Sequence, residues 1–144
     1  MKLSKRTEYG LRALVQLARV WPTHSMQARD LAKQEKLPNK FLEAILLALR
    51  RGGFLESKVG MGGGYRLTRA PRDINVGDLI KRLEGRPAAD PRPQDHPTAG
   101  EIALDFVAGK LTTAISSAMD SMTLEELVEH VNKSQSSTQQ MYYI

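Results

Sequence analysis

The apolar residues in the first third of the chain recur at every third or fourth position, which predicts three helices. We expect these helices over residues 5–20, 26–36 and 38–51. Ser4 and Ser25 are each placed to cap a helix, because a serine hydroxyl accepts hydrogen bonds from the free N–H groups of a first turn. The third helix is predicted to turn one apolar stripe inward, made of Phe41, Leu42, Ile45, Leu46 and Leu49.

Two short strand-like runs follow, over 54–57 and 65–68, and a segment with four glycines in five positions, 60–64, joins them. Glycine accepts positive φ and leaves room for a neighbouring backbone, so the segment predicts a tight hairpin tip that lies against another part of the chain. A fourth helix is expected from Asn75 to Gly85. This order is typical of a winged helix-turn-helix, a mainly α fold with a small β-hairpin.

Thr98 and Glu101 have the spacing of a capping box, which predicts the start of a long helix. About 24 residues of helix would extend roughly 36 Å, which is more than a small domain needs to cover its core. Its apolar positions step by three and four residues, as in a helix that pairs with a second copy of itself. A helix that packs within its own chain is the alternative. The predicted dimerisation stripe consists of Leu104, Val107, Leu111, Ala114, Ile115, Ala118 and Met122.

These patterns divide the 144 residues into four parts. The winged helix-turn-helix is expected over 1–85, and a linker with four of the chain's seven prolines over 86–97. The long dimerisation helix and a short C-terminal helix are expected over 98–133. The polar tail, 134–144, is predicted to be disordered because its Ser- and Gln-rich run offers little apolar surface to bury.

Positive charge is concentrated in the winged helix-turn-helix. Residues 1–87 contribute +10 (18 Lys and Arg against 8 Asp and Glu) and residues 88–144 contribute −5 (3 against 8), which gives the net +5. Such an excess is typical of a protein that binds a polyanion, because each neutralised phosphate releases counterions. No stretch approaches the roughly 20 apolar residues of a membrane-spanning helix, and no signal peptide is recognisable. We therefore expect a cytoplasmic protein with no membrane partner.

The chain has no cysteine, which excludes disulfides, thiol nucleophiles and cysteine-ligated zinc or iron–sulfur clusters. Its three histidines, His24, His96 and His130, do not have the spacing of a helical metal site. The glycine-rich segment does not match a nucleotide-binding loop, because its glycines run into Tyr65 rather than into Lys-Ser or Lys-Thr. No nucleophile–base pair is recognisable either, so we expect neither an enzyme nor a cofactor.

Four stretches together resemble the IscR/NsrR/CymR family of bacterial winged-helix transcription regulators. They are residues 3–14 (LSKRTEYGLRAL), 41–53 (FLEAILLALRRGG), 60–65 (GMGGGY) and 74–80 (INVGDLI), and the likeness extends to about residue 132. The resemblance implies a homodimer held by crossed long helices, which presents two winged helices to a pseudo-palindromic operator in double-stranded DNA and acts as a repressor. It also implies that the third helix enters the major groove and the wing the adjoining minor groove.

Carried onto this sequence, the resemblance assigns base contacts to the start of the third helix and phosphate contacts to its end, to the start of the first helix and to the wing. Asn, Lys and Glu suit adenine, guanine and cytosine edges, respectively. Phe41 suits a thymine methyl group, although its place in the apolar stripe favours the core. The base-contact residues are Asn39, Lys40, Phe41 and Glu43. The other DNA-binding residues are Ser4, Lys5, Arg6, Thr7, Arg50, Arg51, Lys58, Gly62 and Gly63.

Two departures from the family pattern change what the resemblance carries over. Cluster-binding members have three cysteines in the region that corresponds to residues 86–104, so iron–sulfur sensing of that type does not transfer. The input is then expected to be a small molecule or a partner protein. Members of the family often have an arginine beside the wing glycines, where this chain has Val59. The alternative function is a winged-helix module that binds RNA or an acidic protein.

Overall fold

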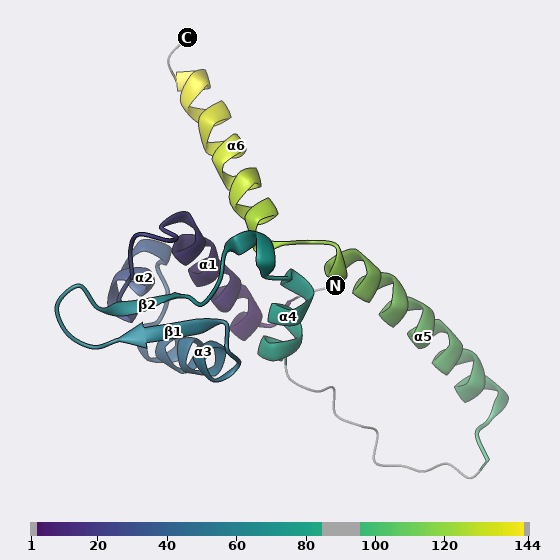
Figure 1. Cartoon of the computed structure of the whole chain (residues 1–144). Coiled ribbons are helices and arrows are strands. Elements are labelled where there is room, and N and C mark those ends of the chain that lie inside the picture. Colours follow the sequence, from purple (N-terminus) through teal and green to yellow (C-terminus); the bar gives the residue numbers. More distant parts are fainter. Residues whose placement is uncertain (1–2, 85–95, 143–144) are drawn as a thin grey trace.

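The computed structural model describes residues 3–84 and 96–142 and has the predicted order of elements (Figure 1). The predicted linker, 86–97, lies almost entirely outside the described residues. The fold class is confirmed: six α-helices, a short 3-10 helix and a two-stranded antiparallel hairpin are described. The elements are α1 (Lys5–Arg19), α2 (Ala28–Glu35), α3 (Asn39–Arg51), β1 (Leu55–Lys58), β2 (Gly64–Leu67), η1 (Pro71–Asp73), α4 (Val76–Glu84), α5 (Ala99–Asp120) and α6 (Leu124–Tyr142).

The predicted start of the first helix is confirmed and its end lies one residue earlier than predicted, whereas the predicted cap of the second is wrong. Ser4 caps α1, because its hydroxyl oxygen accepts a hydrogen bond from the backbone N–H of Thr7 at 3.2 Å. The N-cap of α2 is Gln27 instead of Ser25. The reason is tertiary: Met26 pairs with Tyr65 of β2 through two backbone hydrogen bonds, of 2.9 and 2.7 Å, and this keeps the chain extended until Gln27.

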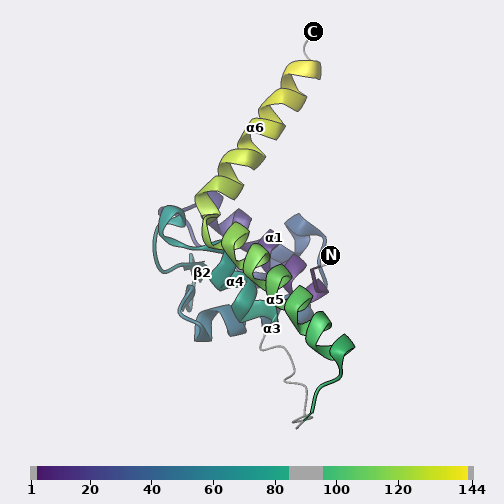
Figure 2. The same cartoon turned by 90° about the vertical axis from the view of Figure 1, so that its right-hand side faces the viewer.

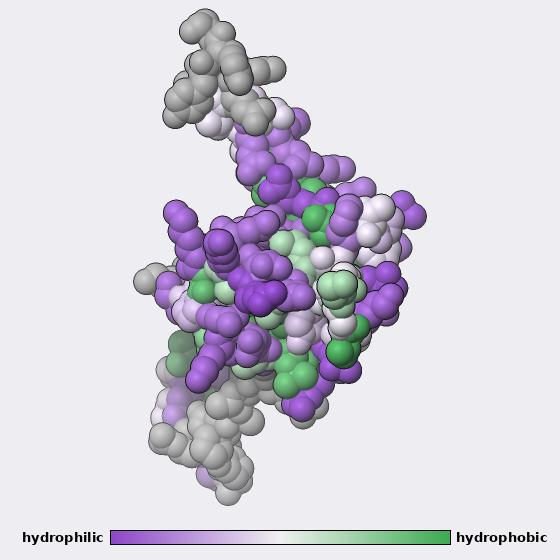
Figure 3. All heavy atoms as spheres, turned by 90° about the vertical axis from the view of Figure 1, so that its left-hand side faces the viewer, coloured by the Kyte–Doolittle hydropathy of each residue, from purple (hydrophilic) through white to green (hydrophobic). Residues whose placement is uncertain are grey.

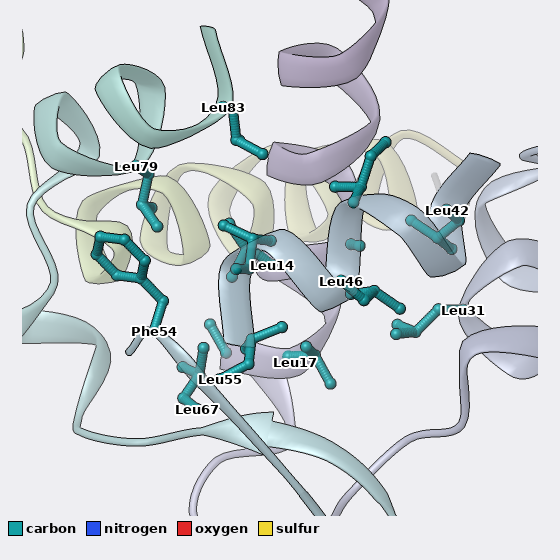
Figure 4. Close-up of a cluster of buried hydrophobic side chains, with 14 of the residues drawn as sticks. Leu14, Leu17, Leu31, Leu42, Leu46, Phe54, Leu55, Leu67, Leu79 and Leu83 are labelled. Atoms are coloured by element: carbon teal, nitrogen blue, oxygen red, sulfur yellow. The ribbon is translucent and has the colours of Figure 1, made fainter. Parts of the chain in front are cut away.

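The helices α1, α2, α3 and α4 and the hairpin share one hydrophobic core (Figure 4). In Figure 4 the labelled leucines of α1, α2, α3, α4 and both strands converge, and α3 runs through the middle of this cluster. Phe41 is the exception among the predicted inward residues of α3, since 40% of its surface is exposed. Successive helical residues lie 100° apart, which places Phe41 about 90° from the centre of the buried face of α3, at its edge. The inward residues of α3 are Leu42, Ile45, Leu46 and Leu49.

The turn between α5 and α6 is fastened to the winged helix-turn-helix. Asn75 caps α4 by accepting a hydrogen bond from the N–H of Asp78, and its amide donates to the carbonyl oxygen of Asp120 at 2.6 Å. Backbone hydrogen bonds of 2.8 and 2.9 Å join Val76 to Met122 and Leu124 to Ile74. Leu124 is itself fully buried in the core. The C-terminal end of α5 is therefore held by the domain of its own chain.

The helix α6 is longer than predicted. It continues to Tyr142 instead of ending near Lys133, so the prediction of a disordered tail over 134–144 is wrong as far as residue 142. The Ser- and Gln-rich run contains no glycine or proline that would stop a helix. The side chain of Gln135 also accepts a hydrogen bond from Arg19 of α1, at 3.0 Å, which ties this part of α6 to the domain.

Figure 1 shows that α5 extends away from the winged helix-turn-helix, and Figure 1 and Figure 2 show that α6 leaves this domain in another direction. The predicted capping box of Thr98 and Glu101 is present at the start of α5. None of its 22 residues is buried. By length and composition α5 could cross a membrane. The prediction that no stretch of the chain is long and apolar enough for a membrane-spanning helix is therefore wrong for α5. Its charged residues Asp105 and Lys110 lie in the middle of the helix, where a membrane would disfavour them.

Candidate nucleic-acid interface

The start of α3 presents four exposed side chains on one side and buried leucines on the other. The four are the residues to which the family resemblance assigns base contacts, Asn39, Lys40, Phe41 and Glu43. Pro38 precedes the helix as its N-cap, and Lys36 has the left-handed backbone conformation that turns the chain between α2 and α3 (φ 56°). Because the opposite face of α3 is locked in the core, these four side chains have a fixed place on the surface.

An aromatic contact links the start of α3 to the start of α1. The ring of Phe41 meets the ring of Tyr9 edge to face, with centroids 5.6 Å apart and planes at 83°. The ammonium of Lys5 lies 5.9 Å from the centroid of the Tyr9 ring. Lys5 and the base-contact candidates of α3 are thereby brought to one surface. The sequence analysis missed Tyr9, because helical spacing alone places it with the apolar residues of α1.

Ser4 and Thr7, two other predicted DNA contacts at the start of α1, form hydrogen bonds within the chain. Thr7 is fully buried, and its hydroxyl donates to Glu84 at the end of α4 at 2.6 Å. The Ser4 hydroxyl donates to the same carboxylate oxygen at 2.8 Å, and the Ser4 backbone N–H does so at 3.1 Å. These bonds, with the Thr7 bond as the largest cause, lower the pKa of Glu84. A buried side chain cannot reach a duplex, so Thr7 drops out of the set of DNA contacts and serves to join α1 to α4.

Arg50 and Arg51 are exposed at the last turn of α3, as predicted. Arg82 of α4, which the sequence analysis did not single out, lies beside them. Its guanidinium Nε donates to the carbonyl oxygen of Ala48 at 3.1 Å, and its side chain fills the space over Gly52. Three arginines therefore gather at the C-terminal end of α3, where the helix dipole also favours positive charge.

The wing is the hairpin β1–β2 with the intervening loop, residues 55–67. Leu55 pairs with Leu67, and both are buried, whereas the next pair, Glu56 and Arg66, faces solvent and forms an ion pair. The predicted close approach of the glycine segment to another backbone is confirmed at Gly64. A Cβ at this position would lie 2.6 Å from the backbone of Met26.

The predicted DNA contacts of the wing are divided between surface and interior. Lys58 and Gly62 are exposed. Gly63 is buried, and a Cβ on it would lie 2.2 Å from the carbonyl oxygen of Lys58. Gly63 therefore drops out of the set of DNA contacts because it is buried, and its role is to close a loop in which only a glycine fits. The face of the molecule from which the wing projects is mostly hydrophilic, with scattered hydrophobic residues (Figure 3).

The predicted dimerisation stripe lies on the uncovered surface of α5. The exposed fractions of Leu104 and Leu111 are 67% and 58%, and Val107 between them is also exposed. Ala114 and Ala118 are exposed as well, whereas Ile115 and Met122, nearer the domain, are half-buried. Apolar side chains in a row of this length are typical of a surface that another protein surface covers.

A model of the Rrf2 family, described as "Iron-dependent Transcriptional regulator", matches residues 3–130. The chain is 29% identical over 131 residues to protein rrf2 of Nitratidesulfovibrio vulgaris, a match that covers 89% of this chain and 87% of that protein. It is also 29% identical to the HTH-type transcriptional regulator CymR of Bacillus subtilis over the full length of both. Among solved structures, IscR of T. potens is similar, with a TM-score of 0.80, 30% identity, and coverage of 94% of this chain and 91% of that one.

The word iron in the family description does not fit the donor atoms of this chain. The full sequence has no cysteine, so no thiolate is available for an iron–sulfur cluster. In the described residues, no three side chains of His, Asp or Glu come together in a metal-binding group. The family match over residues 3–130 and the shared winged-helix fold nevertheless lead to one conclusion: the chain belongs to the Rrf2 family of transcriptional regulators.

Proposed function

We propose that the chain is a homodimeric, sequence-specific DNA-binding repressor that acts in the cytoplasm on a pseudo-palindromic operator. The observation that carries this proposal is the start of α3, where Asn39, Lys40, Phe41 and Glu43 are exposed on a helix whose opposite face is buried. A major groove admits one helix, and a helix fixed in this way would present the same side chains to each half-site.

The charges around α3 would fix the position of the domain on the duplex. Lys5 lies beside the aromatic pair at the start of α3, and Arg50 and Arg51 lie at its end. Arginine and lysine side chains at these places would bind phosphates on both sides of the groove, which sets the register without reading sequence. Arg82 joins this group because it lies beside the end of α3.

The exposed stripe of α5 supports the homodimer. Two copies of α5 that pair through Leu104, Val107 and Leu111 would cover the apolar row and hold two winged helices in a twofold arrangement. Half-sites centred about one helical turn apart, roughly 34 Å, would suit such an arrangement. Bound across a promoter, the dimer would exclude the transcription machinery, and a small molecule or partner protein would supply the input.

The experiment is a selection of duplexes from a random pool with the full-length protein, followed by binding measurements at two salt concentrations. We expect one palindromic sequence to emerge, with an affinity that exceeds that for random duplex about a thousandfold or more and falls steeply with salt. Light scattering of the complex should give two chains per duplex. Equal affinity for all duplexes, or tighter binding of structured RNA than of any duplex, would refute the proposal.

A further inference from the structure

The loop that joins β1 to β2 holds two large apolar side chains entirely in solvent. The exposed fractions of Val59 and Met61 are 98% and 104%, the highest among the exposed large hydrophobic residues of the described chain. A Cβ placed on Gly60 or on Gly62 would meet no atom within 4 Å, so the space around both side chains is open. Neither residue buries surface within this chain, and therefore neither stabilises the fold.

The loop nevertheless holds Met61 in a defined place. The N–H of Gly63 donates to the carbonyl oxygen of Gly60 at 3.0 Å, so Met61 and Gly62 are the central residues of a tight turn. Gly62 has a φ of 76°, as the second central residue of a type II turn requires. At its base the wing is fixed by the pairing of Tyr65 with Met26. Met61 is thus a fully exposed side chain in the turn of a braced hairpin.

We propose that Met61, supported by Val59, is an apolar wedge that enters the minor groove and partly unstacks one base step. This inference rests on the proposed function and adds to it how the wing chooses its sequence. Apolar side chains offer no hydrogen bond to base edges, so the wedge would select a step by how easily it deforms, above all a pyrimidine–purine step. Lys58, exposed at the end of β1, would bind the adjoining phosphate.

The test compares variants of the full-length protein on the duplex that the selection yields, with affinity and the bend of the bound duplex as readouts. The bend is measured by energy transfer between dyes at the two duplex ends. We expect Met61→Ala to lower the affinity roughly tenfold and to reduce the bend, because it removes a contact that discriminates between base steps. Met61→Leu, which keeps an apolar side chain of similar volume, should retain both. The melting temperatures of the free proteins should be equal, since Met61 is fully exposed.

A matched change in the DNA completes the test. Replacing the pyrimidine–purine step under the wing by a stiff A-tract should weaken binding of the wild type and leave Met61→Ala unaffected. Unchanged affinity and bend in Met61→Ala would refute the wedge proposal without contradicting the proposed dimeric regulator. Wild-type behaviour of Met61→Gln would also overturn it, because length and not apolar character would then matter. A wild type that selects no duplex would refute the proposed function and the wedge together.

Discussion

The winged helix-turn-helix and α5 use similar leucines in opposite ways. Leu14, Leu42 and Leu46 are fully buried among neighbours of their own chain, whereas Leu104 and Leu111 are more than half exposed. The first region stabilises itself, since each buried leucine side chain contributes about 1.5–3 kcal/mol relative to an exposed one. Leu104 and Leu111 of the second region gain little of this kind from their own chain. The difference teaches that one chain contains a domain with its own core together with an apolar helix surface that this core does not cover.

The largest effect is expected from a cavity in the finished domain. Leu46→Ala should lower the free energy of unfolding by about 2–5 kcal/mol, because α3 passes through the centre of the core. Chemical denaturation followed by circular dichroism measures this loss. The neighbouring Leu47→Ala is the matched control, since Leu47 lies on the exposed side of the same helix and should change stability by less than about 1 kcal/mol. Equal losses from both variants would contradict the assignment of the two faces.

The next effect concerns α5. Leu111→Glu should place a charge in the proposed dimer contact and weaken dimerisation at least a hundredfold, about 2.7 kcal/mol. The molar mass by light scattering would then fall to that of one chain, 16.0 kDa, while the circular dichroism of the domain stays unchanged. Thr113→Glu is the control: Thr113 is exposed and lies about 200° around the helix from Leu111, away from the stripe. A Leu111→Glu protein that keeps its dimer mass would refute the proposed contact.

A smaller effect is expected at the proposed reading surface. Lys40→Ala should weaken binding to the selected duplex by about 1–3 kcal/mol and binding to random duplex by much less, because a base contact distinguishes sequences and a phosphate contact does not. Lys133→Ala removes the same charge from an exposed position of α6, far along the chain from α3. It should leave the ratio of the affinities for selected and random duplex unchanged. Equal losses on both duplexes would make Lys40 a phosphate contact.

The smallest effect is a pH dependence at the joint of α1 and α4. Hydrogen bonds from Thr7 and Ser4 lower the pKa of Glu84 below its ordinary value of 4.5, so the carboxylate stabilises the fold above that pH. The contribution is lost as the pH falls through the lowered pKa. Glu84→Gln should therefore lower the melting temperature slightly at pH 7 and have less effect near pH 3. A difference between the two proteins that grows on acidification would contradict this sign.

Local hydrogen-bonding signals made much of the fold predictable. Ser4, Asn75 and Thr98 each cap a helix where the sequence indicates, because the bond joins residues three positions apart. The errors have long-range causes. Ser25 fails as a cap because Met26 pairs with Tyr65, far along the chain. The length of α6 was missed because its polar composition indicates disorder, while nothing in that run breaks a helix.

The candidate site was predictable in outline only. The exposed face of α3 follows from helical periodicity, and so do the arginines at its end. Periodicity could not reveal that Thr7 donates a hydrogen bond to Glu84 or that the side chain of Arg82 packs over Gly52. Both contacts bring α4 against residues that are distant in the sequence. It also could not show that Gly63 is interior to the wing loop while Met61 stands outside it. These facts depend on packing between elements, which no single stretch of sequence contains.

The anchored turn at Asn75 and Asp120 makes α5 a lever with one fixed end. Twenty-two helical residues reach about 33 Å, so a tilt of about 10° at the anchor displaces the free end by about 6 Å. That is nearly two base-pair steps, at about 3.4 Å each. In the proposed dimer, a ligand that disturbs the hydrogen bonds of Asn75, Val76 or Leu124 would shift the two winged helices relative to their half-sites without contacting the DNA.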